Sequence, residues 1–369
     1  MTIVELDLRG PDRGRYTKFL DEQGEGLFQS PAWAEVKTGE GWRAWALAAV
    51  EGSEIRAALV ALERRIAPGL GAIWYVPRGP VADFASGEGR EAAARLLDAL
   101  ALRARARRGL SIRVSPDVPE GTWPEGWIEG LGFAAAPGPP WLHRATFRVD
   151  LAREEAAILS SMEGRTRSAI RKASAAGVII DGENTVECFA TFHRMLAATA
   201  ERNAFPLVSS GRMGGLWERS SAQGWGRVFL SRSPDGEPLT GAFVLAPGRR
   251  CHYLFGASLP ACRRLHPNEL LHWEVIRWAR ARGCAAYDLQ GVAGKVGPEH
   301  PLWGNYLFKR GFGGAYVTLA GEFVKVLRPR MDHAIAWGLA RLRGMRGRGG
   351  KGEGIHEGIH DGKREGNHG

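Results

Sequence analysis

The fold is decided by the stretch RVFLSRSPDGEPLTGAFVLAPGRRCHYLFGA, residues 227–257. It holds three strand-like runs, separated by short segments with Pro and Gly, over residues 227–232, 239–246 and 251–257. This pattern predicts an antiparallel meander. A helix-periodic segment over 268–282 follows, ended by Gly283, and then a strand-like run over 285–290. A strand, a helix and a strand in succession predict a parallel strand pair, so we expect a mixed sheet.

The same order of elements occurs in the first half of the chain. Strands, a helix and a last strand are predicted there over residues 45–50, 54–64, 72–76, 90–108 and 110–115. Landmark spacings agree between the halves: 16 residues from Trp42 to Ala58 against 17 from Trp225 to Ala242, and 58 from Tyr75 to Phe133 against 59 from Tyr253 to Phe312. We therefore predict a duplicated α/β unit. This layout is typical of the N-acyltransferase superfamily, so we expect two tandem GNAT-like (acyl-CoA N-acyltransferase-like) domains, each a mixed, mostly antiparallel sheet flanked by helices.

Length and composition indicate where the domains end. A chain of 369 residues with 44% hydrophobic and 24% charged residues is long enough for two globular domains. We expect the first over 1–145 and the second over 146–327. After these, 328–346 predict a basic amphipathic helix, and 347–369 predict a disordered tail rich in Gly and His.

The sequence indicates a cytoplasmic protein without a metal. No apolar run reaches the roughly 18–20 residues that span a bilayer, and the N-terminus is charged from Glu5 onward, unlike a signal peptide. No CxxC pair occurs among the four cysteines: Cys188, Cys251, Cys262 and Cys284. We therefore expect buried free thiols rather than disulfides or zinc ligands.

A formal net charge of +10 favours an anionic partner. Nine basic and five acidic residues lie from Val326 to the end, so the tail carries +4 and the body +6. RNA, a phosphorylated metabolite and an anionic membrane face all fit a basic body, and so does simple solubility charge. Charge alone leaves these alternatives open.

Four segments are distinctive: FQSPAWAEVK (28–37), YVPRGPV (75–81), RTRSAIRKA (165–173), and YDLQGV (287–292) with LFKRGFGG (307–314). Together they resemble the Fem family of peptidoglycan cross-bridge aminoacyltransferases, over residues 3–327. The resemblance implies two tandem acyltransferase-like domains, in agreement with the internal repeat. Some members insert a long coiled-coil arm in the second domain. Only 51 residues lie between Ala173 and Trp225, so we expect the compact form without that arm.

The resemblance also implies a reaction: transfer of an amino acid from aminoacyl-tRNA to an amine of a lipid- or nucleotide-linked muropeptide. Because the ester of an aminoacyl-tRNA is already activated, no enzyme nucleophile and no cofactor are expected. Positioning, removal of a proton from the amine and stabilisation of the oxyanion remain for the protein. By resemblance Lys309 stabilises the oxyanion, and Phe308 offers a π-face to a cation or to the terminal base. The alternative is a core aromatic beside a solvated lysine at a strand end.

Further residues are assigned to the substrates by the resemblance. Lys37, at the end of a predicted helix with Trp33 one turn before it, is expected to contact the muropeptide diphosphate; the alternative is an ordinary lysine at a helix end. Additional substrate-binding candidates are Arg78, Arg202, Arg212 and Tyr253. A row of basic residues without a compensating acid predicts an RNA-phosphate contact, with a solvated helix face as the alternative: Arg165, Arg167, Arg171 and Lys172. Asp288 is a candidate proton acceptor or, alternatively, the cap of the loop that follows its strand.

Two other functions compete with this one. The first is an acyl-CoA-dependent N-acyltransferase acting on a sugar, a polysaccharide precursor or a small amine. Neither meander is followed by the Gly-rich pyrophosphate loop that such an enzyme uses, which weakens this alternative. The second is a non-catalytic RNA- or membrane-binding protein. We also expect the basic segment after Arg328 to favour peripheral contact with the inner face of the membrane, and we expect no DNA partner.

Overall fold

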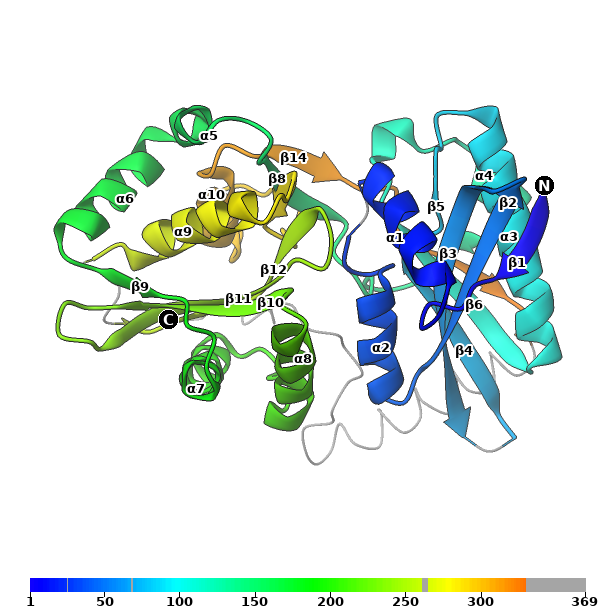
Figure 1. Ribbon diagram of the computed structural model, residues 1–369, viewed down its shortest axis with the longest axis horizontal. Helices are drawn as coiled ribbons and strands as arrows, with labels where there is room; N and C mark the ends of the chain where they lie inside the picture. The colour runs from blue at the N-terminus through cyan, green and yellow to red at the C-terminus, as the bar shows by residue number, and fades with distance from the viewer. Residues whose placement is uncertain (25, 68, 261–264, 330–369) are drawn as a thin grey trace. The chain divides into compact units, whose positions relative to one another are not determined.

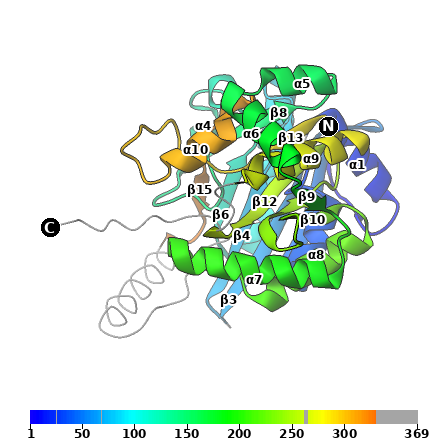
Figure 2. The same ribbon diagram turned by 90° about the vertical axis from the view of Figure 1, so that its left-hand side faces the viewer.

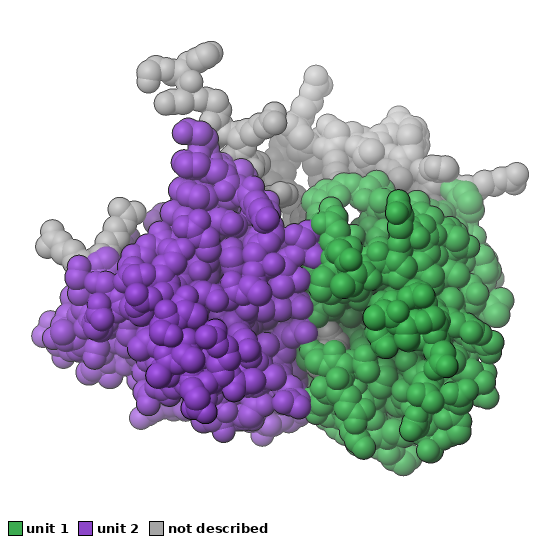
Figure 3. Space-filling view, turned by 90° about the horizontal axis from the view of Figure 1, so that it is seen from above, with its two compact units in different colours: residues 1–144, 319–357 green, residues 145–318, 358–369 purple. Residues whose placement is uncertain are grey.

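The computed structural model describes residues 1–24, 26–67, 69–260 and 265–329 (Figure 1). The tail predicted over 347–369, nearly all of the helix predicted over 328–346, and Cys262 lie outside these residues. The chain divides into two compact units, coloured separately in Figure 3. Unit 1 contains residues 1–144 and the described residues from Leu319 onward, and unit 2 contains residues 145–318. No helix among the described residues is both long and apolar enough to cross a membrane.

Unit 1 is built on one mixed sheet with the strand order β1-β2-β3-β4-β6-β15-β7, and β5 pairs with β3 at its side. Its elements are β1 (Thr2–Glu5), α1 (Asp12–Glu22), α2 (Pro31–Gly39), β2 (Arg43–Glu51), β3 (Glu54–Ala67), β4 (Gly71–Arg78), β5 (Val81–Ala82), α3 (Gly87–Ala106), β6 (Gly109–Pro116), α4 (Trp127–Gly130), β7 (Ala134–Ala135) and β15 (Phe323–Val326). Strand alternation sends Trp74 into the core under α3 and Tyr75 into the core under α1, so helices cover both faces.

Unit 2 repeats this sheet with the order β9-β10-β11-β12-β13-β8-β14. Its elements are β8 (Ala145–Asp150), α5 (Glu155–Ser161), α6 (Gly164–Ala175), β9 (Ile179–Asp181), α7 (Val186–Asn203), α8 (Ser210–Ala222), β10 (Gly226–Arg232), β11 (Pro238–Leu245), β12 (Arg250–Ser258), α9 (Pro267–Ala281), β13 (Ala286–Asp288), α10 (Trp303–Arg310) and β14 (Ala315–Thr318). Figure 2 shows α7 on one side of this sheet and α6 and α9 on the other. The predicted tandem GNAT-like fold is confirmed, and the described residues of unit 2 contain no coiled-coil arm.

In each sheet, one position is filled by a strand that directly follows the other unit in the chain. In unit 2 the place between β13 and β14 is taken by β8, which follows unit 1 in the chain. In unit 1 the matching place between β6 and β7 is taken by β15, which follows unit 2. Residues 319–327, which we expected at the end of the second domain, therefore lie in unit 1. Pairing between strands so far apart in sequence leaves no local signal.

The parallel strand pair differs between the units. In unit 1, β4 and β6 pair over seven residues. In unit 2, β12 and β13 pair over three only, ending at His252 and Asp288. β13 stops before the predicted end of this strand at Gln290, whose backbone is left-handed (φ 55°). From Tyr253 onward, β12 keeps β11 as its partner on one edge, and none of the described strands pairs with its other edge.

Candidate active site

The segment Phe28–Lys37 in unit 1 folds as its sequence dictates. The Ser30 hydroxyl accepts a hydrogen bond from the Trp33 amide (3.0 Å) and Pro31 occupies the first turn, so α2 begins here. The fully buried Gln29 amide donates to the carbonyls of Val60 (3.2 Å) and Pro77 (2.6 Å), which ties the start of α2 to β3 and β4. Helix α2 is thereby fixed on the sheet.

Lys37 lies in the last turn of this helix and is buried, with 4% of its surface exposed. Its Nζ lies 4.5 Å from the centroid of the Trp33 ring and 3.1 Å from Glu40 Oε2. The indole Nε1 of Trp33 is buried and has no hydrogen-bond acceptor within the described part of the chain. Lys37 thus lies at the helix end, as predicted, and is buried beside an aromatic ring and a carboxylate.

Arg78 lies at the end of β4, with left-handed backbone (φ 55°) and 8% of its surface exposed. Its guanidinium lies 6.0 Å from the Phe28 ring centroid and donates to the His143 carbonyl (2.7 Å). Phe28 in turn packs edge-on against Trp33 at 5.2 Å. Arg78 also lines a cavity of ≈ 300 Å³ within unit 1. The predicted residues Trp33, Lys37 and Arg78 are thus joined through one pair of aromatic rings.

The glycine of the YVPRGPV segment has a packing role. A Cβ at Gly79 would lie 2.7 Å from the Gln29 side chain, closer than real Cβ atoms come to such a neighbour. Gln29 is fully buried and bonded to two strands, so it has no room to move away. The first two distinctive segments therefore depend on each other.

Lys309 is the centre of a second group of residues, in unit 2. It lies in helix α10 and is buried, with 5% of its surface exposed, so the alternative of a solvated lysine at a strand end is wrong. Its Nζ donates to the carbonyls of Gln290 (3.1 Å) and Gly291 (2.7 Å). Burial lowers the pKa of Lys309 to about 7, although the charge of Asp288 opposes the shift. The charge of this buried ammonium is thus only partly compensated by the nearby carboxylate of Asp288.

The carbonyls that hold Lys309 are themselves fixed. The Gln290 amide donates to Asp288 Oδ1 (2.8 Å), and its side-chain Nε2 lies 2.8 Å from His252 Nδ1. Asp288 also accepts bonds from Thr146 Oγ1 (2.6 Å) and Arg148 Nε (3.0 Å). These bonds maintain the left-handed backbone of Gln290, which costs free energy in a non-glycine residue.

Asp288 caps the loop rather than acting as a base. Burial raises the pKa of Asp288, but the charges of Arg148 and two other cationic neighbours and the bond from Thr146 outweigh it and lower this pKa to about 2. A carboxylate so stabilised is a poor proton acceptor. The loop-cap alternative from the sequence is therefore the better description.

Aromatic rings surround Lys309 on its other sides. Tyr253 lies 5.8 Å from Lys309 Nζ (ring centroid), and its ring packs edge-on against His272 at 4.5 Å. His272 also contacts Phe308 (5.3 Å) and bonds the Tyr287 hydroxyl (2.7 Å). Burial, and secondarily the charge of Lys309, lower the pKa of His272 to about 3, so it is neutral at physiological pH. The predicted residues Tyr253, Phe308 and Lys309 thus form one site with His272.

Residues in and just before the third distinctive segment pack against α10 and the turn that follows it. The Glu163 amide donates to the Gly311 carbonyl (2.9 Å), and the Arg165 guanidinium donates to the Leu307 carbonyl. A Cβ at Gly313, whose φ is +71°, would lie 2.3 Å from the Ser161 carbonyl oxygen. The third and fourth segments are therefore packed together.

The predicted RNA-contact residues divide into two pairs. Arg165 bonds the Leu307 carbonyl in α10 and pairs with Glu163 (2.8 Å), so the expectation of no compensating acid is wrong for this residue. Arg167 bonds main-chain carbonyls just before α6, so both side chains are engaged within the fold. Arg171 and Lys172 are exposed on the same helix. Only the second pair presents its charges without such bonds among the described residues.

Arg202 and Arg212 are not joined to Lys309 by any described contact. Arg202, at the end of α7, donates to the Ser258 hydroxyl (3.3 Å) at the far end of β12. Arg212 is exposed in the first turn of α8. Both are substrate-binding candidates from the sequence, and no described contact joins them to one another or to Tyr253.

Several site residues escaped the sequence analysis: Thr146, Arg148, His252, His272 and Gln290. Gln290 lies within the YDLQGV segment, so its motif was noticed but its role was not. The others are single polar residues in apolar stretches, which more often mark satisfied core positions than a site. Of the cysteines, Cys188, Cys251 and Cys284 are buried free thiols, as expected.

Comparison with known proteins agrees with this geometry. Residues 160–310 match the acetyltransferase (GNAT) domain model, and residues 12–122 match the FemAB family model. A lipid II:glycine glycyltransferase of Staphylococcus saprophyticus is 23% identical over 83% of this chain and 89% of its own length. Its counterpart in Staphylococcus aureus is 23% identical over 82% of this chain and 88% of its own length.

Solved structures show the same fold. The crystal structure of FemX superposes with a TM-score of 0.79 at 20% identity, and the match covers 91% of this chain and all of that one. A tandem GNAT protein from the clavulanic acid biosynthesis pathway gives a TM-score of 0.50 at 12% identity, covering 88% of this chain and 98% of that one.

Fold and site together define a tandem GNAT-type acyltransferase. Two repeats of one sheet, a strand pair that separates in the second repeat and a buried lysine beside that opening are its distinguishing features. The FemAB match, the glycyltransferase relatives and the FemX structure together confirm the resemblance to the Fem family that the four segments carry. It is an aminoacyltransferase enzyme, which sets aside the non-catalytic alternative.

Proposed function

We propose that this enzyme transfers an amino acid from aminoacyl-tRNA to an amine of a lipid-linked peptidoglycan precursor and so forms interpeptide bridges. The observation that carries the proposal is the buried ammonium of Lys309, held by two main-chain carbonyls beside Tyr253 and Phe308. The relatives described as lipid II:glycine glycyltransferases support the choice of acceptor.

The chemistry follows from the donors of Lys309. An ammonium has three N–H groups, and two of them are used by the carbonyls of Gln290 and Gly291. The third is available to the oxyanion that forms when the acceptor nitrogen attacks the ester carbonyl carbon. The tetrahedral intermediate then collapses: the new C–N bond stays, the ester C–O bond breaks, the amine loses a proton, and the tRNA leaves with a terminal hydroxyl. Lys309 acts here as a cation.

Phe308 and Tyr253 would shape the donor side of this site. Phe308 packs against His272, which is neutral and therefore adds no repulsion to the cationic amino group of an incoming aminoacyl ester. An aromatic face beside a partly desolvated cation contributes about 0.5–2 kcal/mol. The exposed Arg171 and Lys172 are retained as RNA contacts in the proposal, with Arg165 and Arg167 as their structural support.

The acceptor would be held in unit 1. Lys37 and Arg78 are buried cations placed on the Trp33–Phe28 ring pair, and a diphosphate is the ligand for which two such cations are suited. The buried indole N–H of Trp33 gives a further donor. Arg202 and Arg212, in unit 2, remain weaker substrate-binding candidates. Basic residues beyond Arg328 would favour contact with the anionic membrane face where a lipid-linked acceptor lies.

The first experiment tests the identity of the acyl donor. Purified enzyme is given a lipid-linked muropeptide and either a labelled aminoacyl-tRNA pool or a labelled acyl-CoA thioester. We expect label in the muropeptide from the tRNA pool, lost when the pool is treated with ribonuclease beforehand. Transfer from the thioester alone would establish the acyl-CoA alternative, which the GNAT domain match keeps relevant.

A further inference from the structure

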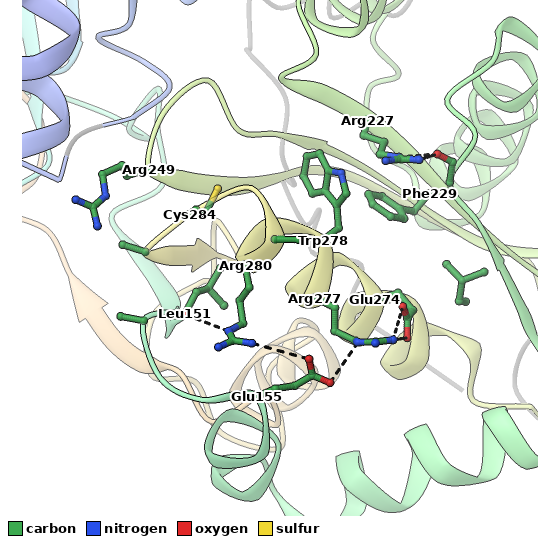
Figure 4. Close-up of a pocket in the computed structure, with 16 residues that line it drawn as sticks. Leu151, Glu155, Arg227, Phe229, Arg249, Glu274, Arg277, Trp278, Arg280 and Cys284 are labelled. Carbon is green, nitrogen blue, oxygen red and sulfur yellow. Dashed lines mark hydrogen bonds and ion pairs between the residues drawn. The ribbon is translucent and has the colours of Figure 1, made fainter.

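Unit 2 has a second concave surface, away from Lys309 and Phe308, with a volume of ≈ 840 Å³ (Figure 4). The C-terminal half of α9, the start of α5, β10 and the turn after β11 form its walls. We call it the arginine groove, because its charged lining includes Arg227, Arg249, Arg277 and Arg280 against Glu155 and Glu274. None of these residues belongs to the four segments that carry the family resemblance.

The positive charges of two of these arginines are compensated by carboxylates in the same groove. Arg277 pairs with Glu155 (3.2 Å) and Glu274 (3.2 Å), and Arg280 lies 3.9 Å from Glu155 and donates to the Leu151 carbonyl (3.2 Å). These pairs hold α9 to α5 and form one wall. They supply little net charge, so the character of the groove depends on its other arginines.

The other positive charge comes from Arg227 and Arg249 in the lining and from Arg282, which is not a lining residue but directly precedes the lining residue Gly283 in the chain. Arg227 and Arg282 lie 5.9 Å and 5.0 Å from the ring centroid of the same residue, Trp278. Burial, and then the charge of Arg282, lower the pKa of Arg227, while the charge of Asp181 opposes the shift, so two like charges lie close together with partial compensation of one of them. Arg249 is exposed at one end of the groove, with Arg227 at the other (Figure 4). Neither Arg249 nor Arg282 forms an ion pair with any residue that the structure describes.

We propose that the arginine groove binds the sugar–phosphate backbone of an RNA, outside the site where its aminoacyl end reacts. This proposal rests on the proposed function, which supplies an RNA donor. Successive phosphates match guanidinium groups spaced along a groove, and the half-buried Trp278 in the lining adds an aromatic side chain that a ribose or base can contact. A bilayer is a less suitable partner, because a flat surface does not enter a concave one.

Helix α9 links the groove to the Lys309 site. His272, which contacts Phe308 and Tyr253, and Trp278, in the groove, lie on this same helix. Six residues of α-helix correspond to a rise of about 9 Å. An RNA that reaches the Lys309 site with its end is therefore within reach of the groove with the adjoining backbone.

The test uses two exposed arginines whose loss removes no ion pair. The double variant Arg249→Gln/Arg282→Gln is compared with wild type and with Arg15→Gln/Arg105→Gln, a control with the same charge change at exposed sites in unit 1. Binding of labelled, unacylated tRNA is measured by anisotropy between 50 and 200 mM KCl. We expect the groove variant to bind roughly tenfold more weakly at low salt and the slope of log K against log salt to fall by about 2, since each lost phosphate contact removes about 0.9.

The outcomes separate the two proposals. Equal affinity and slope for wild type and the groove variant would overturn the groove and leave the tRNA donor intact. A wild-type protein that binds no tRNA would overturn both. If the groove variant instead loses binding to vesicles of anionic phospholipid while its tRNA affinity is unchanged, the surface faces a membrane and the RNA assignment is wrong.

Discussion

At the scale of single residues, the site depends on a lysine kept in an unfavourable place. Lys309 has hydrogen-bond acceptors but no carboxylate within bonding distance among the described residues. The nearby Asp288 instead accepts hydrogen bonds from Thr146, Arg148 and the Gln290 amide. An ammonium in that position is available to a negative charge that appears only during the reaction. This is what an oxyanion-stabilising group requires.

The lowered pKa of Lys309 predicts a pH-dependent stability. Between pH 7 and 10.5 the unfolded chain binds a proton that the folded protein does not, so this group makes wild type more stable as pH rises through that range. Lys309→Met removes the effect. We expect the melting temperature of the Met variant, relative to wild type, to be highest near pH 6 and to decline toward pH 10. A difference that stays constant across this range would show that Lys309 is not desolvated.

Gln290 is predicted to position Lys309. In Gln290→Ala the bond to His252 is lost while the left-handed backbone keeps its cost, so the two carbonyls move away from Lys309 Nζ. We expect kcat for transfer to fall about tenfold, which corresponds to about 1.4 kcal/mol, with little change in the KM of the donor. Gln23→Ala, at an exposed position after α1, is the control. An unchanged kcat would remove Gln290 from the account.

At the scale of elements, sequence patterns located the strands of both meanders and helices α2, α3 and α9, but they gave no prediction for several others, among them α1, α7, α8 and α10. The apolar periodicity of α3 and α9 and the strands of both meanders were predicted to within a few residues. The strand expected to reach Gln290 ends at Asp288, because hydrogen bonds from outside the strand turn its backbone. The same is true of the site: Lys309 and Phe308 were available from the motif, whereas His252 and His272 become site residues only through tertiary contacts.

Helix α2 offers a test at this scale. Ser30→Ala removes the cap that starts the helix carrying Trp33 and Lys37, and it should cost about 1 kcal/mol of the free energy of unfolding. Ser86→Ala removes the matching cap of α3 and should cost a similar amount. Urea unfolding compares the two, and transfer kinetics then separate them. Only Ser30→Ala should raise the KM of the acceptor; an equal rise in both would mean that α2 does not carry the acceptor site.

At the scale of the whole molecule, unit 1 is not one continuous stretch of sequence, because its sheet includes β15, which follows unit 2 in the chain. Spacing between landmarks revealed the duplication because each repeat has the same internal order. It gave no indication that β15 completes the first sheet or that β8 lies between β13 and β14, because these strands pair with partners 136 to 215 residues away in the chain. The fold class was thus accessible from sequence, and the connectivity was not.

Ending the chain at Thr318 tests this arrangement. Loss of β15 uncovers one edge of β6 and breaks its antiparallel pairing from Val114 to Ser111. We expect the amides of β6 to lose protection from hydrogen exchange while those of β13, whose neighbours β8 and β12 remain, keep theirs. Equal protection of β6 in both chains would show that β15 contributes little to the first sheet.

The central claim is that the ammonium of Lys309 stabilises the oxyanion, and single-turnover transfer by Lys309→Met tests it most directly. The measurement follows label from aminoacyl-tRNA to the muropeptide precursor, with Lys295→Met as a control lysine in the same unit and circular dichroism to verify folding. We predict a loss of at least about 100-fold in rate for Lys309→Met with donor affinity retained, and a near wild-type rate for the control. Transfer by a folded Lys309→Met variant at the wild-type rate would contradict the claim.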